Sequence, residues 1–95
     1  MQFANKGTED IWDGIDSKAA RKTLPPSLHG IARRRLLAIN AATRLADLGF
    51  PLGNGLEALS GDRQGQHSIR INDRYRVCFR WKDAGRTEVE IVDYH

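Results

Sequence analysis

Cysteine and long apolar runs are scarce in this chain, and each scarcity excludes a class of protein. The 95 residues include one cysteine, Cys78, so an internal disulfide is excluded and a reducing compartment is expected. No apolar run approaches the ~18 residues that a membrane-spanning helix requires. Residues 1–6 lack the hydrophobic stretch of a secretory signal. We therefore expect a single cytoplasmic domain over residues 1–95 that does not contact a membrane.

Metal and nucleotide motifs are also missing from the sequence. The three histidines, His29, His67 and His95, lack the spacing of metal ligands. The glycines stand in expected turns and form neither a dinucleotide-binding motif nor a P-loop. Cys78 has no histidine near it in the sequence, which favours a strand residue over a nucleophile. The sequence thus predicts no metal and no other cofactor.

Charge is distributed unevenly along the chain. The net charge of +3 and the isoelectric point near 9.4 are mild for a nucleic-acid-binding protein. The segment from Arg63 to Arg86 contains seven basic residues, with Asp73 and Asp83 as its only acids. Acidic residues are instead concentrated near the N-terminus. This asymmetry predicts a basic working face in the C-terminal half. The N-terminal acids are Glu9, Asp10, Asp13 and Asp16.

Helical signals occupy the first half of the chain. Thr8 is a suitable N-cap for a short first helix, with Glu9 and Asp10 in its first turn. A second helix is expected to begin near Pro26 or Ser27, and Gly49 ends the helical region. Apolar residues at helical spacing are expected to face the core. They are Ile11, Trp12 and Ile15 in the first helix, and Leu28, Ile31, Ala32, Leu36, Ile39 and Ala42 in the second.

Short strands separated by turns follow from residue 56 onward. The pattern predicts strands over residues 56–59, 66–71, 75–81 and 87–92. In the third of these, Tyr75, Val77, Phe79 and Trp81 alternate with Arg76, Cys78 and Arg80. Helices first and a meander of strands afterwards predict an α+β domain, with two or three N-terminal helices packed on one face of a small antiparallel sheet.

The last three residues, Asp93, Tyr94 and His95, place three proton-handling groups directly after an expected strand. Histidine titrates near physiological pH and therefore suits general acid or base catalysis. The alternative is a solubilising tail without chemistry.

Arginines line the face of the expected sheet that points away from the helices. Period-two alternation places Arg70, Arg76 and Arg80 together there, with no interleaved acids on the adjacent strands. Such a face can bind phosphates and stack on bases, although a solvated outer face is the commoner reason for this pattern. Residues 33–35, three consecutive arginines, also suit nucleic acid, but a charged outer helix face explains them more simply.

Two blocks of sequence resemble a known family. Residues 56–81, LEALSGDRQGQHSIRINDRYRVCFRW, and residues 89–95, VEIVDYH, resemble the HigB toxins of type II toxin–antitoxin systems, within the RelE/ParE superfamily. Residues 32–47 also resemble this family. The resemblance implies a small α+β microbial ribonuclease fold and metal-independent cleavage of mRNA on the 70S ribosome. It also implies a helix-turn-helix antitoxin of the HigA type, through which alone the toxin would reach operator DNA.

The resemblance also assigns roles to residues. Asp93, Tyr94 and His95 match the catalytic tail, and Arg76 matches the strand arginine that binds the phosphate. Glu57 or Asp93 is the expected base and His95 the expected acid, with Arg63, Arg70 and Arg80 in RNA binding. Where some members carry histidine and lysine in a His-Pro-Leu-Lys-Gly block, this chain has Glu57 and Ser60.

Two further interpretations stay open at this point. One is a non-catalytic inhibitor like the ParE toxins, which act on DNA gyrase. The other is a degenerate member that only binds its antitoxin and represses its own operon. For the antitoxin, the acidic first helix and the outer face of the second offer a binding surface away from the arginines.

Overall fold

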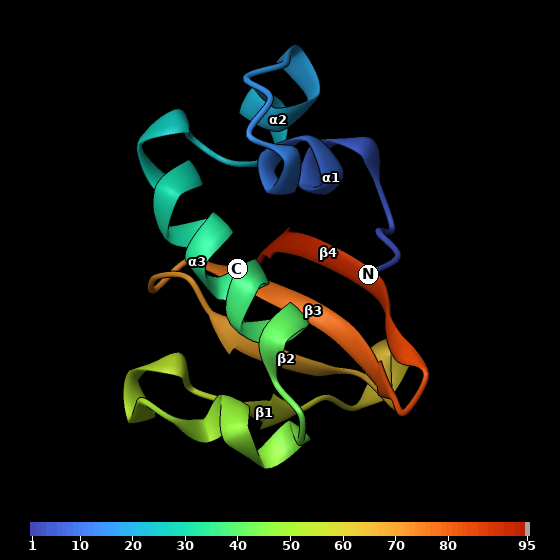
Figure 1. Cartoon of the computed structure of the whole chain (residues 1–95). Helices are drawn as coiled ribbons and strands as arrows, with labels where there is room; N and C mark the ends of the chain where they lie inside the picture. Colours follow the sequence, from blue (N-terminus) through green and yellow to red (C-terminus); the bar gives the residue numbers. More distant parts are fainter. Residues whose placement is uncertain (95) are drawn as a thin grey trace.

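The computed structural model describes residues 1–94, in which three α-helices lie on one side of a four-stranded antiparallel sheet (Figure 1). The helices precede all four strands in the sequence. This arrangement confirms the predicted α+β fold and agrees with the RelE-like fold that the resemblance implied. Within the described part of the chain, no helix is long and apolar enough to cross a membrane.

Two short helices form the N-terminal hairpin. Helix α1 (Lys6–Asp13) begins at Asn5, whose side chain accepts a hydrogen bond of 2.9 Å from the Thr8 amide. The sequence-based N-cap, Thr8, is therefore wrong by three residues, because Asn5 is an equally good cap. Thr8 is instead fully buried, and its hydroxyl accepts a 3.1 Å hydrogen bond from the Ile91 amide. Helix α2 (Lys18–Thr23) is capped by Ser17.

Helix α3 (His29–Ala41) follows a 3-10 turn over Pro26–Leu28, close to the predicted start. It ends at Ala41, and the predicted continuation to Gly49 is a separate 3-10 helix, Leu45–Gly49. A further 3-10 turn, Leu52–Asn54, lies in the predicted loop. Of the predicted core positions in α3, Ala32, Leu36 and Ile39 are fully buried. Leu28, Ile31 and Ala42 are partly buried against the same core.

The sheet is a meander in which every strand pairs with its neighbour in sequence. Phe3 adds an isolated parallel bridge to Val89 at the outer edge. All four predicted strands are present. Their bounds are β1 (Glu57–Ala58), β2 (His67–Arg70), β3 (Tyr75–Lys82) and β4 (Gly85–Asp93).

The core lies between the helices and one face of this sheet. Alternation directs Ile69, Val77, Phe79, Val89 and Ile91 toward the helices, where all five are buried. The opposite face of the sheet is left to the residues between them. That face carries the predicted arginines, so the hydrophobic pattern decides which side of the sheet is available for chemistry.

Candidate functional site

Strand register brings the predicted site residues to one face of the sheet. Glu57 pairs with Ser68, and Arg76 on β3 pairs with Val92 on β4. Residues opposite one another in a sheet project to the same face, and so do residues two apart along a strand. Tyr94 therefore follows Val92 onto the face that carries Arg76. Glu57, Ser68, Arg76 and Tyr94 define what we call the arginine face.

Arg76 is held in position by hydrogen bonds on two sides. Its Nε donates to the Ser68 hydroxyl at 2.7 Å, and one terminal nitrogen donates to the Gly55 carbonyl. Ser68 is fully buried, so this hydroxyl does not exchange its partner for water easily. Gly55 has a φ of 56°, a backbone conformation that glycine adopts without strain. The guanidinium is thus fixed before any ligand arrives.

Tyr94 covers the same guanidinium. The central carbon of the Arg76 guanidinium lies 5.5 Å from the centre of the Tyr94 ring, within the range of a cation–π contact. The Tyr94 amide donates a 2.7 Å hydrogen bond to the Arg74 carbonyl, so the tail is still attached to the sheet at residue 94. The Tyr94 side chain is nevertheless about half exposed, and its ring can reach a ligand. The predicted acid, His95, lies outside the described residues.

Asp93 is engaged elsewhere. Its carboxylate accepts hydrogen bonds from Arg74 at 2.7 and 2.9 Å, and this ion pair raises the pKa of the Arg74 guanidinium. Asp93 pairs with Tyr75 in the register, so it projects to the face opposite Tyr94. The structure therefore brings Arg76 and Tyr94 together but directs Asp93 away from them.

The remaining arginines of the predicted basic face are each paired with an acid. Arg63 lies 3.2 Å from Glu90, Arg80 lies 2.5 Å from Glu88, and Arg70 pairs with Asp73. The prediction of a face without interleaved acids is therefore wrong. The reason is the register of β4: Glu90 stands opposite Cys78, on the arginine face.

A β-bulge in β4 places the second of these acids. The β3–β4 register shifts between Cys78 and Arg80, so Glu88 and Val89 together oppose Phe79. Glu88 takes a φ of 53°, which is uncommon for a residue with a side chain. Its carboxylate binds Arg80, and that contact lowers the pKa of Glu88 below its ordinary value. The bulge puts Thr87 in the register position opposite Arg80, and Glu88 still reaches Arg80 from the bulged position.

Glu57 and Ser60 lie on the exposed edge strand and the turn that follows it. Both are solvent-exposed, and neither forms an ion pair or side-chain hydrogen bond in the part of the chain that the structure describes. Glu57 is opposite Ser68, whose hydroxyl holds Arg76. Glu57 on β1 and Arg76 on β3 are separated by β2, and the Arg76 side chain reaches Ser68 on that middle strand. A solvent-accessible carboxylate therefore lies on the strand next to the one that holds the guanidinium.

Cys78 is not available for nucleophilic chemistry. It is fully buried, and burial raises the pKa of its thiol above the ordinary value, which keeps the thiol protonated and unreactive. This agrees with its interpretation as a strand residue. Among residues 1–94, no three histidine, cysteine or acidic side chains are grouped to hold a metal ion.

Two residues of the site were not singled out from the sequence. Ser68 and Gly55 make the contacts that hold Arg76. Alternation did carry a signal for Ser68, because it is two residues before Arg70 and therefore on the same face. No comparable signal marked Gly55, because its carbonyl meets Arg76 only as a result of how the loop before β1 folds.

Comparison with known proteins gives consistent results. The model of the HigB-like toxin family, described as RelE-like toxins of type II toxin–antitoxin systems, matches residues 1–95. Toxin HigB-1 of Vibrio cholerae is 36% identical over 84 residues, which cover 88% of this chain and 85% of that protein. An uncharacterized protein of Haemophilus influenzae is 32% identical over 60 residues, covering 63% and 59% of the two chains.

Proposed function

The chain belongs to the HigB-like toxins of type II toxin–antitoxin systems, and we propose that it is a metal-independent endoribonuclease that cleaves mRNA on the translating ribosome. The observation that carries this proposal is the Tyr94 ring over the fixed Arg76 guanidinium. It places Tyr94, the residue before His95 in the sequence, over a cation suited to a phosphate. A toxin that only binds another protein has no need of this combination.

Arg76 supplies the phosphate-binding step. Two of its three nitrogens are engaged with Ser68 and Gly55, and no hydrogen bond in the described structure uses the third. Arginine has five N–H donors, so several remain for the oxygens of a phosphate. A guanidinium held in advance stabilises the charge that develops on phosphorus without reorganising during the reaction.

Glu57 and His95 supply the proton transfers. The 2′-oxygen of the ribose attacks the adjacent phosphorus and gives its proton to Glu57, while the bond from phosphorus to the 5′-oxygen breaks. His95 donates a proton to that leaving oxygen, and a cyclic phosphate and a 5′-hydroxyl result. We assign the base to Glu57 because Asp93 is bound to Arg74 and projects to the other face. General acid–base assistance of this kind contributes about 10²–10⁴-fold.

Surrounding residues bind the RNA strand. Arg63, Arg70 and Arg80 flank the arginine face, with Ser60 at its edge, and Tyr94 stacks on a base at the cleaved bond. Each arginine must exchange a carboxylate for a phosphate. The Arg70–Asp73 and Arg80–Glu88 pairs are exposed, and such pairs contribute only about 0–1 kcal/mol, so their exchange costs little. The Arg63–Glu90 pair is partly buried. The antitoxin is of the HigA type, links the toxin to operator DNA, and meets it in the cytoplasm.

The test compares variants of the site with a distant arginine. Arg76→Ala and His95→Ala are expected to relieve growth inhibition and to remove cleavage products in primer extension on translated mRNA. Arg76→Lys keeps the charge but loses the forked geometry, and should retain little activity. Arg21→Ala removes an exposed arginine paired with Asp16 on the helical side and should remain fully toxic.

Folding and antitoxin binding of each variant provide the control, measured by thermal unfolding and by co-purification. If Arg76→Ala and His95→Ala fold, bind antitoxin and still arrest growth, the nuclease proposal is wrong. Relaxed or knotted plasmid DNA together with intact mRNA would then favour the gyrase-directed alternative.

A further inference from the structure

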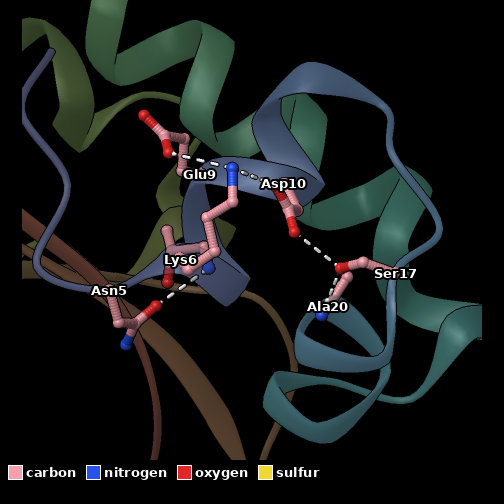
Figure 2. Close-up of polar contacts among 7 residues, drawn as sticks. Asn5, Lys6, Glu9, Asp10, Ser17 and Ala20 are labelled. Atoms are coloured by element: carbon pink, nitrogen blue, oxygen red, sulfur yellow. Dashed lines mark hydrogen bonds and ion pairs between the residues drawn. The ribbon is translucent and has the colours of Figure 1, made fainter.

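Two acids of the first helix, Glu9 and Asp10, form contacts within the N-terminal hairpin. Figure 2 shows Asp10 between Lys6 and Ser17, at 3.0 Å from the Lys6 Nζ and 2.6 Å from the Ser17 Oγ. Asp10 is buried, and Ser17 in turn caps α2 through the Ala20 amide. Glu9 also lies near Lys6. The Asp10 contacts thus connect α1 to α2, and Asp13 is the exposed acid of α1.

Two neighbouring cations on α3 have no acidic partner among the described residues. Arg33 and Arg34 on α3 form no ion pair within the described residues, and α3 contains no acidic residue. Arg35, the third member of the run, is different, because its Nε donates to the Arg70 carbonyl at 2.9 Å and attaches α3 to the sheet. Arg33 and Arg34 thus present positive charge that the fold itself does not use.

An apolar hollow lies between these two arginines. It has a volume of about 190 Å³ and is lined by Trp12, Arg33, Arg34 and Leu37. Leu37 is 56% exposed, although Leu36 beside it on α3 is fully buried. Binding sites for small molecules typically measure about 300–1,000 Å³. This hollow is smaller, and it fits a single large apolar side chain.

We propose that this hollow receives an apolar side chain from an acidic amphipathic segment of the antitoxin. The inference rests on the toxin–antitoxin partnership and specifies where, and with what chemistry, the partner docks. The apolar side chain would cover Trp12 and Leu37, and flanking carboxylates would pair with Arg33 and Arg34. Anchor residues in a desolvated pocket, surrounded by charged contacts, are the usual source of affinity in protein interfaces.

The same observations disfavour two other occupants. A second copy of this chain would bring Arg33 and Arg34 against identical charges across a two-fold axis. RNA would gain phosphate contacts with the arginines, but it has no aliphatic group for the hollow, and Trp12 is half-buried and offers little of its ring for stacking.

The experiment measures the affinity of purified toxin variants for the antitoxin encoded beside the toxin gene, by titration calorimetry. Leu37→Ser should weaken binding about ten- to a hundredfold, because an apolar contact is lost. Reversal of both charges, Arg33→Glu with Arg34→Glu, should weaken it about tenfold at low salt and less at high salt. The matched controls are Leu52→Ser, a leucine 85% exposed in the 3-10 turn Leu52–Asn54, and Lys82→Glu.

Both controls should bind the antitoxin as the wild type does, and Leu37→Ser should still cleave mRNA and arrest growth. These results would separate the docking surface from the proposed nuclease site, because Arg76→Ala should bind the antitoxin normally but fail to cleave mRNA. Unchanged antitoxin affinity of Leu37→Ser, or an equal loss in Leu52→Ser, would overturn the inference. So would dimers of the toxin alone that depend on Leu37, or loss of ribosome binding on reversal of Arg33 and Arg34.

Discussion

The position of one guanidinium depends on a buried hydroxyl. Ser68 has no exposed surface, and its Oγ accepts the Arg76 Nε proton at 2.7 Å. We regard Ser68 as a positioning residue, since it acts on the phosphate only through Arg76. The Gly55 carbonyl holds the far end of the same group, so removal of the hydroxyl would leave Arg76 tethered at one point instead of two.

Ser68→Ala should therefore reduce the rate of cleavage about ten- to a hundredfold. The reason is that a guanidinium moved out of position stabilises the transition state less, even though its own charge and donors are unchanged. Stability should fall by only about 1 kcal/mol, the net value of one hydrogen bond. Primer extension on mRNA and urea unfolding measure the two effects. Cys78→Ala is the matched control: Cys78 is equally buried and opposite Ser68 in the register, but does not contact Arg76 by hydrogen bond.

Ser68→Ala and Cys78→Ala should thus differ more in the rate of mRNA cleavage than in the free energy of unfolding. Equal losses of cleavage in the two variants would show that Ser68 acts through general packing and has no specific effect on Arg76.

At the scale of elements, the α1–α2 hairpin depends on a glycine that allows close approach. A Cβ added to Gly7 would lie 2.7 Å from the Ala19 carbonyl oxygen and would also collide with the Thr23 hydroxyl. Thr23 already donates to that carbonyl at 2.9 Å, so neither atom can move without loss. Gly30, likewise near the start of its helix, has only the flexible end of Arg34 within reach.

The two glycines should respond in opposite ways to alanine. Gly7→Ala should destabilise the protein by about 1–3 kcal/mol, the range for overpacking. Gly30→Ala should stabilise it by about 0.5 kcal/mol through the lower entropy of the unfolded chain and better helix propensity. Chemical unfolding of the two variants beside the wild type measures both. A neutral Gly7→Ala would show that α2 can move away from α1 without cost.

The whole molecule should lose stability in acid through a few carboxylates. The Ser17 hydroxyl and then Lys6 lower the pKa of Asp10, and contacts with Arg44 and Arg80 lower the pKa values of Asp47 and Glu88. A carboxyl whose pKa is lower in the folded state stabilises the fold at pH values above its unfolded pKa. That contribution disappears as the pH falls through the folded pKa.

Asp10→Asn tests this linkage. The variant should be less stable than the wild type near neutral pH, and the difference should shrink as the pH falls below about 4, where the unfolded carboxyl begins to bind protons. Urea unfolding at several pH values between about 6 and 2 gives the curve. Asp13→Asn, an exposed acid of the same helix with no ion pair in residues 1–94, should run parallel to the wild type. A constant difference between Asp10→Asn and wild type across this range would reject the assignment.

Local patterns in the sequence determined the elements and the two faces of the sheet. The alternation from Tyr75 to Trp81 predicted β3 within one residue, and the helical spacing of Ala32, Leu36 and Ile39 predicted the buried side of α3. Both patterns are repeats among residues that are close in sequence, so they can be recognised from the order of the residues alone. The position of Arg76 on the sheet face away from the helices followed from the same alternation.

Tertiary structure alone decided which charges meet. The pairing of Arg63 with Glu90 and of Arg80 with Glu88 depends on how β4 is registered against β3, which the alternation within a single strand does not set. The hydrogen bond from the Ile91 amide to Thr8 spans 83 positions, and the hollow beside Leu37 forms only where α1 meets α3. Contacts between distant segments are set by how whole elements pack, and no short-range pattern contains that information.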